Sequence, residues 1–325
     1  MELAVLDLGS TTFHLQHFAA TPLPGAALRP VDQPLASVLD EKRSICMGAQ
    51  VFVDGHIDRT SWQRGLDAVS DLLDVSDARG FSERSLVATS AIRSARNGAD
   101  FVAELERRHA CKVRVLEPHD EARLAYLGQL TSPVVSGRRI AAIDLGGGSV
   151  ELAVGEGLQL AHADSLPLGA VRMRVCEGAQ VFGEPEAGAL AQVLREHLET
   201  PLAQVQRHAP ELVVFGSGSA RAARKLLCRA GKLPGKTGPI EVQGFDAALA
   251  ELLGSSQQQL IDLGVEPARA QTVLVSAAIM LQLLRQLGFD HAFVSDKGLR
   301  DGVAFELQHR TACRDRAAAQ LSAVF

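Results

Sequence analysis

The sequence predicts an α/β protein built from two copies of one domain, with a ligand cleft between the copies. Short apolar segments alternate with longer amphipathic ones, which is the pattern of strands alternating with helices. Two segments, one starting at Leu3 and the other at Ile140, follow one plan: an apolar strand, then Asp-Leu-Gly, then small residues and another apolar run. The 325 residues are enough for two domains.

The elements follow from these patterns in chain order. The expected strands are the apolar runs 3–6, 85–88, 112–116, 140–143, 152–154, 212–215 and 292–294. The expected helices are the amphipathic or apolar stretches 62–75, 99–109, 121–128, 186–208 and 269–287. We expect Gly128 to stop the third helix and Pro201 to divide the fourth.

Two domains are expected, at residues 1–124 and 125–325, and the final C-terminal helix is able to pack back on the first. The apolar stretch 272–287 would serve either as core of the second half or as a dimer interface. Core packing is the favoured interpretation, and the sequence leaves homodimer formation open.

Composition narrows the class of protein. Hydrophobic residues make up 46% and charged residues 22%, as in globular proteins with a sizeable core. The net charge of −5 argues against a general nucleic-acid binder. No apolar run approaches the roughly 18 residues of a membrane span, and Asp7 interrupts the first apolar run early. The five scattered cysteines indicate no disulfide framework or zinc site, so we expect a cytoplasmic protein.

A glycine-rich turn follows the strand at 140–143. Gly146, Gly147 and Gly148 allow a ligand to approach the backbone closely, and the amides through Ser149 can form an anion-binding nest. Asp144 and Glu151 can reach one cation, and Mg²⁺ binds one or two carboxylates together with waters and phosphate oxygens. The alternative is a tight hairpin turn without a ligand.

The turn after the first strand repeats this chemistry with hydroxyls. Asp7 and Gly9 precede Ser10, Thr11 and Thr12, whose side chains and amides can donate to phosphate oxygens. The alternative for this first turn is again a hairpin turn that binds no ligand. The pairing of two such loops weakens that alternative for both.

Three further segments suit phosphate chemistry. Arg93 could clamp a phosphate, or be a solvated surface arginine. Glu121 could deprotonate the attacking water, or simply cap its helix. Ser217, Gly218 and Ser219 open a helix after a strand, where an anion site and a packed turn are equally expected.

Together these segments resemble the exopolyphosphatase / guanosine pentaphosphate phosphohydrolase family of the actin-like superfamily. The matching segments occur in family order at 6–10, 88–98, 120–128, 142–152, 165–172 and 295–303. The resemblance implies two actin-like (ribonuclease H-like) domains. It also implies roles for the residues above: Glu121 as catalytic base, Asp144 and Glu151 as Mg²⁺ ligands, Arg93 facing phosphate, and the loops at 7–12, 146–149 and 217–219 as phosphate loops.

The activity implied is release of a terminal phosphate from inorganic polyphosphate by water attack. Guanosine pentaphosphate is the alternative substrate, and an ATPase or sugar kinase and a non-catalytic polyphosphate or alarmone sensor remain further alternatives. Thr11 and Thr12 stand where the family usually has Asn and Ser, and Gln271 where it often has Asp. Because the chain stops near the end of the family's two-domain core, shorter polyphosphates are the expected substrates.

Overall fold

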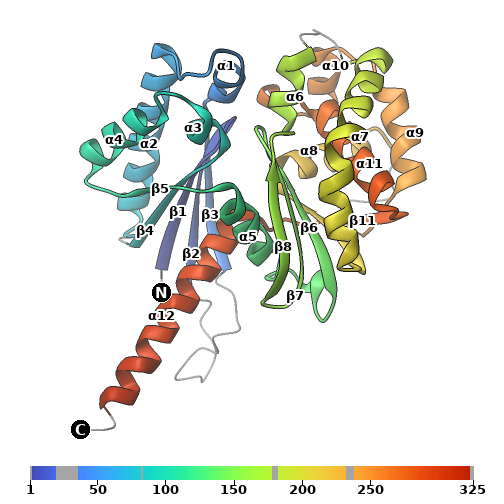
Figure 1. The fold of residues 1–325 in the computed structure, drawn as a ribbon. Coiled ribbons are helices and arrows are strands. Elements are labelled where there is room, and N and C mark those ends of the chain that lie inside the picture. Colours follow the sequence, from blue (N-terminus) through green and yellow to red (C-terminus); the bar gives the residue numbers. More distant parts are fainter. Residues whose placement is uncertain (1, 20–35, 82, 178–181, 232–237, 323–325) are drawn as a thin grey trace.

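The computed structural model of the chain describes residues 2–19, 36–81, 83–177, 182–231 and 238–322. Two β-sheets, each covered by helices, form two lobes that stand side by side, with α5 (Pro118–Gln129) between them (Figure 1). The first lobe is the sheet of β1–β5 with α1–α4, and the second lobe is the sheet of β6–β11 with α6–α11. No helix in these described ranges is long and apolar enough to cross a membrane.

The first sheet has the order β3-β2-β1-β4-β5. Strands β1, β2 and β3 are antiparallel neighbours, and β4 and β5 continue the sheet in parallel with β1. Its strands are β1 (Glu2–Leu8), β2 (Thr12–Ala19), β3 (Ala36–Ser44), β4 (Glu83–Ala88) and β5 (Val113–Val115). Its helices are α1 (Met47–Asp54), α2 (Arg59–Ala78), α3 (Ser90–Ser94) and α4 (Gly98–His109).

The second sheet repeats this plan in the order β8-β7-β6-β9-β11, with β10 added at the edge. Again three antiparallel strands are followed by parallel ones. Its strands are β6 (Arg139–Leu145), β7 (Val150–Glu156), β8 (Gln159–Leu166), β9 (Leu212–Gly216), β10 (Ile240–Glu241) and β11 (His291–Val294). Its helices are α6 (Ala170–Glu177), α7 (Glu184–Arg207), α8 (Ser217–Arg229), α9 (Val242–Leu252), α10 (Gln257–Asp262) and α11 (Val273–Leu287). The predicted duplication is therefore present in the strand order.

Two helices join the lobes. Helix α5 packs on β6, β7 and β8, and α12 (Leu299–Ser322) packs on α5 and β1. At the crossing of α5 and α12, a Cβ atom built on Gly302 would overlap the carbonyl oxygen of Leu124, and one built on Gly128 would overlap that of Gly298. The two backbones can meet this closely only because both residues are glycines. The predicted domain boundary after residue 124 falls within α5 and stays a prediction.

Two predicted helix features are wrong. Helix α7 continues through Pro201, because its apolar stripe is buried on both sides of the proline, at Leu190, Leu194, Leu198, Leu202 and Val205. Burial of that stripe offsets the hydrogen bond that the proline removes. The start of the helix predicted at 269–287 is the second: the helix is present and ends at Leu287, but it begins at Val273, because a 3-10 turn at Pro267–Arg269 precedes it. Helix α11 is buried along nearly its whole length within its own lobe, which agrees with the core interpretation.

Candidate active site

A pocket lies between the lobes, where both Asp-Leu-Gly turns meet the starts of α8 and α12. With one exception, the predicted site residues line it: Asp7, Gly9, Ser10, Thr11, Thr12, Glu121, Asp144, Gly146, Gly147, Gly148, Ser149, Glu151, Ser217, Gly218 and Ser219. Both turns are hairpin turns, as the plainer alternative required, but they face one shared pocket.

Backbone hydrogen bonds from residues 45–48, at the start of α1, fix the first Asp-Leu-Gly turn. The amides of Ile45 and Cys46 both donate to the carbonyl oxygen of Thr11 at 2.9 Å, and the amide of Gly48 donates to that of Ser10 at 2.8 Å. These carbonyls are therefore satisfied within the protein. Ser10, Thr11 and Thr12 line the pocket, and a hydroxyl group can donate a hydrogen bond to an anion.

The glycine turn is held in the same way by the start of α6. Its carbonyl oxygens at Gly146 and Gly147 accept from the amides of Ala170 at 3.0 Å and Val171 at 2.8 Å. The carbonyl of Gly148 accepts from Arg172 Nε at 2.9 Å. Because α6 occupies these acceptors, the turn can present donors to a ligand without opposing carbonyl dipoles.

Arg172 also connects the second lobe to the first. Its guanidinium lies 4.0 Å from the ring centroid of Phe52 in α1, and Nη2 lies 3.4 Å from Ser94 Oγ, at the end of α3. A Cβ built on Gly148 would overlap the Phe52 ring, so the glycine is needed for this approach. One side chain thus contacts the glycine turn and both lobes.

Four carboxylates share the pocket. Burial raises the pKa of Asp144 to about 6, with the charge of Asp7 adding to it and Arg221 and Arg300 opposing it. Burial raises the pKa of Glu151 well above its usual value, and the charges of Glu121 and Asp144 raise it further. Burial likewise raises the pKa of Asp7, although Arg300 lowers it. Such a group of carboxylates is stabilised by an added cation.

Residues for a metal ion are present at the second turn. Asp144 and Glu151 face each other directly in the β6–β7 pairing. Asp7 Oδ1 is buried and has no hydrogen-bond partner within the described residues. Those residues contain no cluster of three or more His, Cys, Asp or Glu suited to a metal. Mg²⁺ needs only one or two carboxylates beside waters and phosphate, so the pair fits Mg²⁺ and the assignment stays a prediction.

Glu121 lies in the first turn of α5 and is buried. Burial raises its pKa to about 7; the Arg93 charge and hydrogen bond lower it, and Asp7 and Asp144 raise it. Arg93 Nη1 donates to Glu121 Oε2 at 2.7 Å and to the Leu116 carbonyl at 2.5 Å. Arg93 is therefore the exception among the predicted residues: it is not among those that line the pocket. Its guanidinium contacts the Glu121 carboxylate, and its predicted role facing phosphate stays a prediction.

The turn between β9 and α8 carries backbone strain. Ser217 has φ of +81°, in the left-handed region that non-glycine residues rarely adopt. Its Oγ accepts from the Ala220 amide at 3.1 Å, and it opens a helix of 13 residues. The start of a helix favours anions, because its first amides have no acceptors within the helix and carry the positive end of its dipole. Strain at a pocket residue is typical of functional sites.

Comparison with known proteins decides the family. The model of the Ppx/GppA phosphatase family matches residues 28–311. The chain belongs to the Ppx/GppA phosphatase family. It is 26% identical to exopolyphosphatase 1 of Mycobacterium tuberculosis strain H37Rv over 318 residues, covering 93% of this chain and 87% of that protein. It is also 26% identical to exopolyphosphatase 1 of Mycobacterium leprae, covering 93% and 88%.

Solved structures of the Ppx/GppA family share the fold. An exopolyphosphatase from Cytophaga hutchinsonii superposes with a TM-score of 0.83 at 19% identity, covering 95% of this chain and 98% of that one. The Aquifex aeolicus Ppx/GppA family member gives 0.75 at 23% identity, covering 96% and 98%. The predicted fold class, an α/β protein in which one sheet plan occurs twice, is confirmed.

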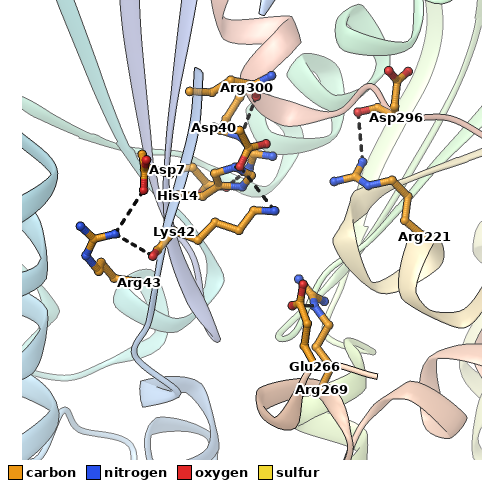
Figure 2. Close-up of polar contacts among 12 residues, drawn as sticks. Asp7, His14, Asp40, Lys42, Arg43, Arg221, Glu266, Arg269, Asp296 and Arg300 are labelled. Carbon is orange, nitrogen blue, oxygen red and sulfur yellow. Dashed lines mark hydrogen bonds and ion pairs between the residues drawn. The ribbon is translucent and has the colours of Figure 1, made fainter. Parts of the chain in front are cut away.

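Sequence reasoning missed several residues that line the pocket of this Ppx/GppA protein: His14, Lys42, Thr89, Ser90, Arg221, Arg269 and Arg300. Arg300, at the start of α12, donates to Asp7 Oδ2 and to Gln16 Oε1, both at 3.0 Å. His14 Nε2 lies 2.6 Å from Asp40 Oδ1, and burial lowers the His14 pKa to about 3 (Figure 2). Strand pairing could have pointed to His14, because it faces Asp7 as Glu151 faces Asp144.

Proposed function

We propose that the protein releases the terminal phosphate of inorganic polyphosphate by attack of water on the phosphoanhydride bond. The observation that carries the proposal is the position of Glu121. Its carboxylate lines the same pocket as both phosphate turns, and Arg93 holds it in place. A buried carboxylate with a pKa of about 7 can accept a proton near neutral pH.

The protein groups divide the work in a simple way. The turns at 9–12 and 146–149, with the start of α8, bind the oxygens of the last phosphates. Glu121 accepts a proton from the attacking water, and the oxygen of that water forms the new bond to phosphorus. The bond to the bridging oxygen breaks, and the shortened chain leaves with the electron pair. Most of the rate enhancement is expected from positioning and charge stabilisation.

Asp144 and Glu151 would hold Mg²⁺, with Asp7 close by. The raised pKa values of these three carboxylates, and the unpartnered Oδ1 of Asp7, support a cation there. When bound, Mg²⁺ would neutralise charge on the phosphate oxygens. Arg221 and Arg300 add positive charge to the same pocket.

The relatives supply independent support. The mycobacterial proteins that match nearly the whole chain are named exopolyphosphatases, and so is the Cytophaga structure with the same fold. The family name also includes GppA, so guanosine pentaphosphate is the competing substrate.

Phosphate release from polyphosphate, guanosine pentaphosphate and ATP, each with and without Mg²⁺, tests the proposal. We expect the highest kcat/KM on polyphosphate and no activity without the metal. A higher kcat/KM on guanosine pentaphosphate would reassign the substrate. Binding of polyphosphate without release of phosphate from any of the three would indicate a sensor.

A further inference from the structure

A second groove opens beside the active pocket, along α8. Four residues line both: Lys42, Gly218, Arg221 and Arg269. The groove then continues past Lys225 to the segment at 264–266. The two spaces are therefore continuous, and a ligand seated in the pocket can extend into the groove.

The groove carries an excess of positive charge. Its charged lining consists of Lys42, Arg221, Lys225, Arg269 and a single carboxylate, Glu266. That carboxylate lies 3.4 Å from Arg269, and its side chain is 64% exposed. The whole chain has a net charge of −5, so this concentration of cations is local.

Two of these cations have no acidic partner within the described residues. Arg221 donates to the backbone carbonyl of Asp296 at 3.0 Å and is in no ion pair there. Lys225 is exposed and is in no ion pair in the described part of the chain. Burial and the charge of Arg300 lower the pKa of Arg221, and the charge of Arg269 lowers it further, while the charges of Asp144 and Asp301 oppose this shift. Cations held together in this way favour an anion among them.

Geometry gives the groove a direction. Gly218, Arg221 and Lys225 are spaced three and four residues apart on α8, so they lie on one face of the helix. At a rise of about 1.5 Å per residue, this stripe leads roughly 10 Å away from the start of the helix in the pocket. Lys42, from the first lobe, extends toward Arg221 from the opposite side (Figure 2).

We propose that this groove binds the phosphates of a polyphosphate chain behind the terminal ones, with Lys225 as a determinant of chain-length preference. The inference rests on the proposed function, and it adds a binding subsite for a linear polyanion outside the phosphate turns. An extended chain suits a continuous row of cations from both lobes. Arg221 and Arg269 belong to both spaces, so Lys225 is the residue that tests the groove alone.

The test compares tripolyphosphate with long-chain polyphosphate for the wild type and for Lys225→Glu, Lys225→Ala and Lys225→Arg. For Lys225→Glu we expect KM for the long chain to rise about three- to five-fold relative to that for tripolyphosphate, as for one exposed ion pair. The Arg variant should restore the ratio, and added salt should shrink the difference. Lys112→Glu is the control, because Lys112 is exposed and lies outside both spaces.

An unchanged ratio in Lys225→Glu, or an equal change for both substrates, overturns the inference. A change in KM for guanosine pentaphosphate alone would place a nucleoside end in the groove instead. Direct binding of long-chain polyphosphate to the Glu121→Gln variant, with and without Lys225→Glu, separates the two proposals. Lys225-dependent binding, together with a wild-type protein that hydrolyses no polyphosphate, would keep the groove and reject the hydrolase.

Discussion

The guanidinium of Arg93 donates to the carboxylate of Glu121 at 2.7 Å, although the two residues lie 28 positions apart. The same nitrogen donates to the carbonyl of Leu116, just before α5. Arg93 therefore fixes the direction of the Glu121 carboxylate and partly offsets the effect of burial on its pKa. A residue expected to bind phosphate is placed to tune and orient the proposed base.

Replacement of Glu121 by Gln should reduce turnover about 10²–10⁴-fold, the usual contribution of a general base. KM should change little, because the amide keeps the size of the carboxylate. Asp120→Asn is the matched control: Asp120 precedes Glu121 in α5 but pairs with Arg114 at 2.8 Å. Near-normal turnover in Glu121→Gln would refute the assignment.

The pH dependence should report the ionisation of Glu121. The base works when ionised, so kcat/KM should fall as pH drops through the pKa of about 7. Arg93 lowers that pKa, so Arg93→Met should move the acidic limb to higher pH. Full pH–rate profiles of both proteins provide the measurement. A limb that stays in place would show that Glu121 does not set it.

Removal of divalent metal by EDTA should abolish activity, and added Mg²⁺ should restore it. In Asp144→Asn the Mg²⁺ concentration for half-maximal activity should rise by about 10–100-fold or more. A loss of about 10–100-fold in metal affinity is typical when a residue that only supports a metal ligand is replaced. A titration of activity against Mg²⁺ measures this, with Asp120→Asn again as control. Equal Mg²⁺ requirements in Asp144→Asn and wild type would exclude Asp144 as a ligand.

Arg172 and Phe52 should act as one unit across the lobes. Each single replacement, Arg172→Met or Phe52→Leu, should lower kcat/KM. The kcat/KM of the double variant should be no lower than that of the less active single variant. The expected coupling is about 1 kcal/mol, as for a cation–π contact. Arg174→Met, on the same helix, is the control. Fully additive effects would mean that the contact does not support the glycine turn.

Gly302→Ala should destabilise the protein by about 1–3 kcal/mol, because the new methyl group would overlap the Leu124 carbonyl at the crossing of α5 and α12. Gly188→Ala, in α7, is the matched control, since nothing lies near its Cβ position. That change should be neutral or stabilise by up to about 1 kcal/mol. Urea unfolding of the three proteins measures the difference, and equal destabilisation would contradict the packing argument.

Local pattern was enough to predict much of the fold. An apolar strand ending in Asp-Leu-Gly was recognised twice, and both copies form the same hairpin beside the pocket. Strands β2, β3 and β8 were not predicted, because their polar residues weaken the apolar runs by which strands are recognised. Pro201 was misjudged for a related reason: burial along α7 outweighs a local helix breaker.

The duplicated α/β architecture, the two Asp-Leu-Gly turns and the choice of Glu121 as candidate base could all be predicted from the sequence. These features rest on chain-local signals: strand periodicity, glycine backbone freedom and residue order. Three contacts could be seen only in the folded molecule: Arg93 with Glu121, Arg300 with Asp7, and the two helices that touch at Gly128 and Gly302. A long charged side chain can point in many directions, and the partner that fixes its direction lies far away in the chain.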